Sequence, residues 1–213
     1  QLGLTAARRR GFTEARGDFI VMVDDDNELA SDYLAEVRRL FAVYTRIGAF
    51  GGKNRPEFET QPPVWMREFD SLIACRDLGE AELIAHELWN ADLCRNEYPV
   101  CAPIGAGMAL RREALQPWLD DSTSEQLSDR RGDELTSGGD NDIVLNLLRH
   151  GWEAGYFPSL TLTHLIPTGR TTRDYLAQLN RSIACSWIKV LAKHNACPWA
   201  PIPAWTLPLR QAK

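Results

Sequence analysis

Three acidic side chains follow a short apolar run near the start of the chain. Residues 19–23 are Phe, Ile, Val, Met and Val, and Asp24, Asp25 and Asp26 come directly after them. Such a run predicts a buried strand, and carboxylates at a strand end are oxygen ligands that hold a divalent cation against a phosphate. The alternative is a turn in which Asp26 or Ser31 caps the following helix. Because three adjacent acids repel one another, a cost that a simple turn does not need, we favour the cation site.

Two further polar sets lie at predicted element ends. Asp140 and Asp142 follow a hydrophilic run over residues 120–139, which is typical of an active-site lid or a disordered segment. His164 follows a predicted strand over residues 156–163. Open α/β sheets bind ligands where strand ends meet at one edge, so we expect these polar sets to converge there.

Apolar periodicity predicts the elements that position these residues. The order helix, strand, helix, strand in the first quarter of the chain indicates an α/β fold with a mostly parallel sheet flanked by helices. The predicted helices cover residues 5–15, 32–44, 111–119, 141–150 and 172–193, and the predicted strands cover 19–23, 47–52, 103–110 and 156–163. Residues 53–64 are polar and Pro-rich, which predicts a loop.

Composition limits the class of protein. A chain of 213 residues with 44% hydrophobic and 25% charged residues is typical of one globular domain. We expect that domain over residues 1–197, followed by a Pro- and Trp-rich tail over 198–213. A net charge of −5 argues against a nucleic-acid partner, which would normally require a basic face.

Cysteine usage and hydropathy bear on location. The five cysteines are scattered without a Cys-x-x-Cys pair, so neither a disulfide framework nor a zinc site is indicated, and a reducing cytoplasm is expected. The sequence has no apolar run long enough to span a bilayer. Trp199 and Trp205 leave two interpretations of the tail: packing against the last helix, which we favour, or a peripheral contact at the inner face of the membrane.

Four segments taken in order strongly resemble glycosyltransferase family 2, whose enzymes have the GT-A fold. The resemblance covers roughly residues 3–180, and its matching segments are 3–26, 105–112, 138–151 and 157–167. It implies that the family's first strand, with the segment that holds the nucleotide base, would precede Gln1. By this resemblance the domain is N-terminally incomplete.

The resemblance also implies roles for the first acidic set. Asp26 and His164 would be ligands of Mn²⁺ or Mg²⁺, and Asp24 would lie nearer the nucleotide ribose. Asp25 is included among the residues that bind the nucleotide; because it points to the other side of an extended chain, holding the turn is its alternative role. The chemistry agrees, since a cation on the diphosphate offsets the charge that builds on the leaving group.

Asp140 matches the carboxylate that acts in this family as general base on an acceptor hydroxyl. A hydroxyl is a poor nucleophile, so such a base is chemically needed. The family usually has an acidic residue where this chain has Gly139, and an N-cap of the following helix is the alternative role for Asp140. Arg8 matches a family arginine that lies beside the nucleotide, with a solvated helix face as its alternative. From residue chemistry, we also predict that Arg170 binds a phosphate and that Gly105 allows close approach of the ligand, or else of another backbone segment.

The function that the resemblance implies is metal-dependent, inverting sugar transfer. The donor would be a UDP-, GDP- or dTDP-sugar, and the acceptor a saccharide or a lipid-linked molecule, as in polysaccharide biosynthesis. A non-catalytic or degenerate carbohydrate- or metal-binding module of the same fold is the alternative, suggested by Gly139. We expect His86, His150 and His194 to be structural or exposed.

Overall fold

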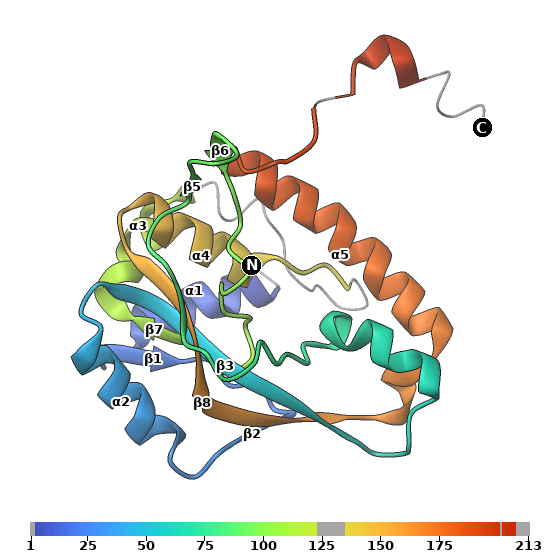
Figure 1. Cartoon of the computed structure of the whole chain (residues 1–213), viewed down its shortest axis with the longest axis horizontal. Coiled ribbons are helices and arrows are strands. Elements are labelled where there is room, and N and C mark those ends of the chain that lie inside the picture. The colour runs from blue at the N-terminus through green and yellow to red at the C-terminus, as the bar shows by residue number, and fades with distance from the viewer. Residues whose placement is uncertain (1–2, 123–134, 201, 208–213) are drawn as a thin grey trace.

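The computed structural model describes residues 3–122, 135–200 and 202–207, and these form a layered α/β domain (Figure 1). The α-helices are α1 (Leu4–Glu14), α2 (Tyr33–Val43), α3 (Gln116–Asp120), α4 (Gly139–Arg149) and α5 (Arg173–Lys193). The 3-10 helices are η1 (Val64–Ile73), η2 (Arg112–Leu115), η4 (Thr168–Thr171) and η5 (Ala204–Thr206). The strands are β1 (Phe19–Val21), β2 (Asn27–Leu29), β3 (Ile47–Phe58), β4 (Leu83–Ala85), β5 (Trp89–Asn90), β6 (Arg95–Asn96), β7 (Ala109–Arg111) and β8 (Glu153–Ile166).

A central sheet organises the described residues. Its strand order is β1-β7-β3-β8-β2, and β4 pairs with β8 outside this path. The two long strands β3 and β8 are parallel, and they form the longest ladder, from Ile47 opposite Glu153 to Phe58 opposite Ile166. The other pairings, β1–β7, β3–β7, β2–β8 and β4–β8, are antiparallel. The α/β class and the flanking helices are therefore confirmed, in a mixed sheet whose parallel component is the β3–β8 pair.

Successive strand residues point to opposite sides of the sheet, so apolar side chains lie on both faces and helices pack against each face. Ala49 and Leu110 face a cluster that includes Trp118 of α3 and the apolar side of α4. Phe50 and Ala109, their neighbours in the sequence, face a second cluster formed with α2. A third cluster joins η1, α5 and the end of β8; its buried members are Met66, Ile73, Cys75, Ile166, Leu176 and Leu179. This third cluster holds α5 over the end of β8, where His164 lies.

Most helix predictions are confirmed within a few residues, while three strand predictions are wrong in extent. The predicted loop over 53–64 is wrong in its first half, because β3 continues to Phe58 along β8. The predicted strand over 103–110 shrinks to Ala109–Arg111. β8 extends past the predicted end of the strand to Ile166, so His164 lies inside it. Most of the predicted lid falls on residues 123–134, which lie outside the described residues.

The described part of the tail, residues 198–200 and 202–207, extends away from the body of the domain in Figure 1. Its two tryptophans are well exposed, with 58% of Trp199 and 76% of Trp205 accessible to solvent. The favoured interpretation, packing of these rings against the last helix, does not hold at this exposure. In the part of the chain that the structure describes, no helix is both long enough and apolar enough to cross a bilayer.

Candidate functional site

The acidic turn connects β1 to β2. The backbone N–H of Asn27 donates to the carbonyl of Asp24 at 3.1 Å, and the N–H of Asp24 donates to Asn27 Oδ1 at 3.3 Å. Asp24 and Asp25 are exposed, whereas Asp26 is partly buried. The N-cap of α2 is Asp32, and no side chain caps that helix. The capping hypothesis for Asp26 or Ser31 is therefore wrong.

Asp26, His164 and Arg170 form a compact group, which we call the carboxylate–histidine cluster. Asp26 Oδ2 lies 3.4 Å from His164 Nε2 and accepts a hydrogen bond of 2.7 Å from Arg170 Nη1. The pairing of β2 with β8 places Asn27 opposite His164, and the N–H of Leu165 donates to the carbonyl of Asp26 at 2.8 Å. Two paired strands thus hold the carboxylate and the imidazole in register.

The donor atoms of this cluster fit a divalent cation. A carboxylate oxygen and an imidazole nitrogen that face each other are a set that Mn²⁺ accepts, and Mg²⁺ also binds through one or two carboxylates and substrate phosphates. Within the described residues, no group of three or more His, Cys, Asp or Glu side chains is arranged to bind a metal. Two protein ligands would leave the remaining positions to phosphate oxygens and water.

Gly105 brings Arg8 and Asp140 together in a second group, which we call the glycine-loop cluster. The N–H of Gly105 donates to Asp140 Oδ2 at 2.8 Å. A Cβ built on Gly105 would lie 3.2 Å from Arg8 Nη2 and 3.2 Å from Asp140 Oδ2, so a side chain at this position would crowd both groups. Arg8 comes from α1, Gly105 from the loop before β7, and Asp140 from the first turn of α4.

Asp140 does not cap its own helix. The N-cap of α4 is Gly138, and no side chain makes a capping hydrogen bond there. The carboxylate of Asp140 instead turns toward the loop, where it accepts a hydrogen bond from the backbone N–H of Gly105. It stays partly exposed, so one of its oxygens can meet a ligand.

The loop of residues 100–107 is held by side chains that the sequence did not single out. Arg76 donates to the carbonyls of Val100 (2.6 Å) and Ala102. Asn54 Nδ2 donates to the carbonyl of Ala106 at 3.1 Å, and the buried hydroxyl of Tyr33 donates to the carbonyl of Gly107 at 2.5 Å. These donors come from positions far apart in the sequence, so no local pattern indicates them.

The same loop links the two clusters. The N–H of Gly107 donates to the carbonyl of Met22 at 3.0 Å, and Met22 precedes Asp24 by two residues. Gly107 has a φ of +77°, and a Cβ there would lie 2.4 Å from Leu162 of β8. A glycine is therefore required where the loop packs between the acidic turn and β8.

Asp142 belongs to a separate buried network. Its carboxylate accepts from Trp118 Nε1 at 2.7 Å and from His194 Nε2 at 2.7 Å, and it pairs with Lys193 Nζ at 2.8 Å. Burial acts to raise the pKa of Asp142, but these hydrogen bonds outweigh it and hold the pKa below its usual value. Asp142 thus turns away from Asp140 and ties α4 to the end of α5. His194 is fully buried, which confirms a structural role for it.

Comparisons with known proteins place the chain in a family. The model of glycosyltransferase-like family 2 matches residues 1–184. Among curated protein sequences, none matches the chain. A solved structure of GalNAc-T7 with UDP, GalNAc and Mn²⁺ is similar at a TM-score of 0.52 and 12% identity, over 89% of this chain and 34% of that one.

A second similar structure is Staphylococcus aureus TarS 1–349 in complex with UDP-GlcNAc, with a TM-score of 0.49 and 14% identity, over 90% of this chain and 52% of that one. The chain thus spans about a third of the first structure and about half of the second. At such low identity, the likeness to GalNAc-T7 supports only the GT-A fold. The family match covers most of the chain, and the protein therefore belongs to glycosyltransferase-like family 2.

Proposed function

We propose that this protein transfers a glycosyl unit, with inversion, from a nucleotide-sugar donor to a hydroxyl of a saccharide or lipid-linked acceptor. The observation that carries the proposal is the placement of Asp140. Its carboxylate points away from α4 and accepts a hydrogen bond of 2.8 Å from the N–H of Gly105. It stays partly exposed near Arg8. Family membership and the UDP and UDP-sugar complexes of the two similar structures support a nucleotide-sugar donor.

Asp140 is the proposed general base. With Oδ2 held by Gly105, Oδ1 accepts the proton of the acceptor hydroxyl as its oxygen attacks the anomeric carbon. The bond from that carbon to the diphosphate breaks on the opposite face, so the configuration inverts. The nucleoside diphosphate leaves with the bonding electron pair.

The carboxylate–histidine cluster is the proposed diphosphate site. Asp26 and His164 would hold Mn²⁺ or Mg²⁺, which offsets the charge that develops on the leaving diphosphate. In this proposal Asp24 lies toward the ribose and Asp25 holds the turn. Arg8 and Arg170 are the proposed donors to the nucleotide and its phosphates, and Gly105 lets the loop approach the donor closely.

Calorimetry on the natural full-length protein tests donor binding. We expect one of UDP, GDP or dTDP to bind in the presence of Mn²⁺ or Mg²⁺, and to bind much more weakly after EDTA removes the cation. A protein that binds none of the three diphosphates with either cation would contradict the proposal.

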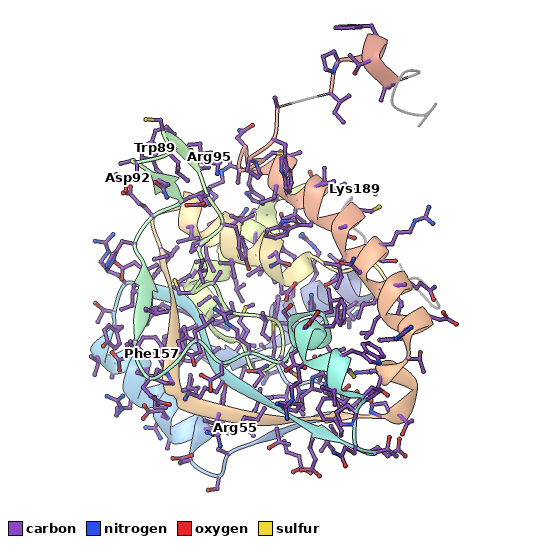
Figure 2. The ribbon with its side chains drawn as sticks, turned by 45° about the vertical axis from the view of Figure 1, so that its right-hand side comes forward. Arg55, Trp89, Asp92, Arg95, Phe157 and Lys189 are labelled. Atoms are coloured by element: carbon purple, nitrogen blue, oxygen red, sulfur yellow. The ribbon has the colours of Figure 1, made fainter. Side chains whose placement is uncertain are left out.

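Asp140→Asn tests catalysis. We expect transfer to fall about 10²- to 10⁴-fold while diphosphate affinity stays unchanged, because the amide cannot accept the proton. The control is Asp92→Asn, an exposed residue of the β5–β6 hairpin labelled in Figure 2, which should leave transfer unchanged. The alternative, a binding module, predicts diphosphate or saccharide binding with no transfer in the unmodified protein. Proton NMR of the product checks the inverted anomer.

A further inference from the structure

The guanidinium of Arg170 contacts both candidate cation ligands at once. Its Nη1 lies 2.7 Å from Asp26 Oδ2 and 3.4 Å from His164 Nε2. The two ligand atoms are themselves 3.4 Å apart, so the three atoms form a small triangle. A positive group therefore already lies against the carboxylate and the imidazole that would hold a cation.

The contact with His164 engages the electron pair that a metal needs. A guanidinium only donates hydrogen bonds, so in its contact with Arg170 the acceptor is His164 Nε2. A neutral imidazole nitrogen has one lone pair in the ring plane. It can accept from Arg170 or coordinate a cation, but it cannot do both.

His164 Nδ1 is buried and, within the described residues, has no hydrogen-bond partner. Within the described residues, no carbonyl or carboxylate accepts from Nδ1 and so fixes the orientation of the ring. Among the described residues, the polar contacts of the imidazole are therefore those of Nε2 with Arg170 and Asp26, at the atom that would bind a cation.

Arg170 has the longest side chain of the group and lies outside the paired strands. Asp26 and His164 lie on or beside the paired strands β2 and β8, and the His164 side chain is only 6% exposed. Arg170 reaches them from the short helix η4 with a long side chain that is 29% exposed. The guanidinium can rotate toward solvent about its side-chain bonds, whereas strand pairing holds the backbones of Asp26 and His164 next to each other.

We propose that Arg170 competes with the divalent cation, holding Asp26 and His164 while the cation is absent and leaving them when it binds. The inference rests on the cation-ligand roles given to Asp26 and His164 in the proposed function. Two costs oppose cation binding: the lost hydrogen bonds of the guanidinium, and the repulsion between two positive charges at short distance. The protein with Arg170 in place therefore binds the free cation weakly.

The test is a titration of the protein with Mn²⁺ alone, in which electron paramagnetic resonance measures the free ion. We expect Arg170→Met to lower the Kd for Mn²⁺ about tenfold relative to the unmodified protein, the scale of one hydrogen bond to a charged group. Arg170→Gln should change the Kd in the same direction. An equal or higher Kd in both variants would overturn the competition.

A matched control separates the contact from a general loss of positive charge. Arg173 lies three residues further along the chain, but its guanidinium is 5.3 Å from the centre of the Trp65 ring. Arg173→Met should therefore leave the Kd for Mn²⁺ close to that of the unmodified protein. A decrease equal to that of Arg170→Met would show that charge alone explains the effect, and would overturn the proposal.

Asp26→Asn distinguishes a failure of the competition from a failure of the site. If Asp26→Asn weakens Mn²⁺ binding but Arg170→Met leaves it unchanged, the cation site stands and the competition fails. If Asp26→Asn does not alter binding, Asp26 is not a ligand, and the cation site of the proposed function fails with it.

Thermal unfolding gives a second readout that does not depend on turnover. A cation that binds only the folded state raises the melting temperature more when its Kd is lower. Mn²⁺ should therefore raise the Tm of Arg170→Met more than that of the unmodified protein. Equal increases would contradict the proposal, whatever the Tm of the metal-free variant.

Discussion

At the scale of single residues, Gly105 is the point where Arg8 and Asp140 meet. The N–H of Gly105 holds the Asp140 carboxylate, and its missing side chain leaves room for the Arg8 guanidinium. Both neighbours are the ends of flexible side chains. A methyl group there would move the Arg8 guanidinium and the proposed base, Asp140, without unfolding the loop.

Gly105→Ala should therefore reduce transfer more than stability. We expect a loss of at least about tenfold in kcat/KM, because small displacements of a catalytic group are costly. The Tm should change little. The control is Gly11→Ala, since a Cβ at Gly11 meets nothing within 4 Å. Full activity in Gly105→Ala would show that the close approach is not needed.

Substitution of Tyr33 tests how strongly its hydroxyl stabilises the loop of residues 100–107. Its hydroxyl donates to the buried carbonyl of Gly107. Tyr33→Phe leaves that carbonyl without its donor, so the free energy of unfolding in urea should fall by about 1–3 kcal/mol. Tyr44→Phe is the matched control, because the Tyr44 hydroxyl contacts Glu82 at the surface and its loss should cost about 0.5 kcal/mol or less. Equal losses in the free energy of unfolding in the two variants would contradict the role of the Tyr33 hydroxyl in holding the loop.

At the scale of elements, the junction of α4 and α5 depends on Asp142. The buried carboxylate accepts from α3 through Trp118 and from the end of α5 through Lys193 and His194. Asp140 lies two residues earlier on the same helix, so this junction fixes the first turn of α4 and the orientation of the proposed base.

The lowered pKa of Asp142 predicts how stability depends on pH. Below the unfolded pKa, close to the ordinary value of 3.8, the unfolded chain binds the proton that the folded protein still excludes. The stabilisation is therefore complete above about pH 4 and is lost as the pH falls through the lower, folded pKa. Asp142→Asn should lower the free energy of unfolding at pH 7 and flatten its decline as the pH falls below about 4.

Urea unfolding across that pH range checks the prediction. The exposed Asp92→Asn serves as the control and should follow the unmodified protein. Parallel curves for Asp142→Asn and the unmodified protein would show that the buried network does not govern acid stability.

At the scale of the whole molecule, the described part of the tail is apolar and exposed, whereas the protein as a whole carries a net negative charge. The exposed tail carries Trp199 and Trp205, and Trp89 of the nearby β5–β6 hairpin is also half exposed (Figure 2). The hairpin contacts the end of α5 and the start of the tail, since Asn96 donates to the carbonyl of His194 at 3.1 Å and Arg95 donates to the carbonyl of Pro198 at 3.2 Å. Tryptophan is well suited to the interface of a bilayer, where one part of the ring is apolar and another polar.

We therefore expect the tail to contact lipid through its rings. The protein should sediment with phosphatidylcholine vesicles, and replacing Trp199 and Trp205 with Ser should abolish this. Because the net charge is −5, raising the salt concentration should not weaken the contact. Val64→Ser is the control, since Val64 is 91% exposed but lies in η1, away from the tail in Figure 1. A failure of the unmodified protein to sediment would rule out this contact.

Local patterns predicted the helices well and the sheet less well. α2, α4 and α5 were found because their apolar residues recur at helical spacing. The second half of β3 was missed because its polar residues gave no strand pattern; Lys53, Asn54 and Arg55 are ordered by pairing with β8. Ladder hydrogen bonds between distant strands do not show in a local window.

The sequence by itself determined the α/β class, the family and the types of residue that carry the chemistry, since these follow from local periodicity and from motif order. Only the tertiary structure decided their partners. It paired Arg170 with Asp26 and His164, turned Asp140 toward Gly105, and assigned Asp142 to a buried network. Acids two residues apart, such as Asp140 and Asp142, look alike in the sequence. They differ because a helix turns their side chains in different directions, and each meets different neighbours from distant parts of the chain.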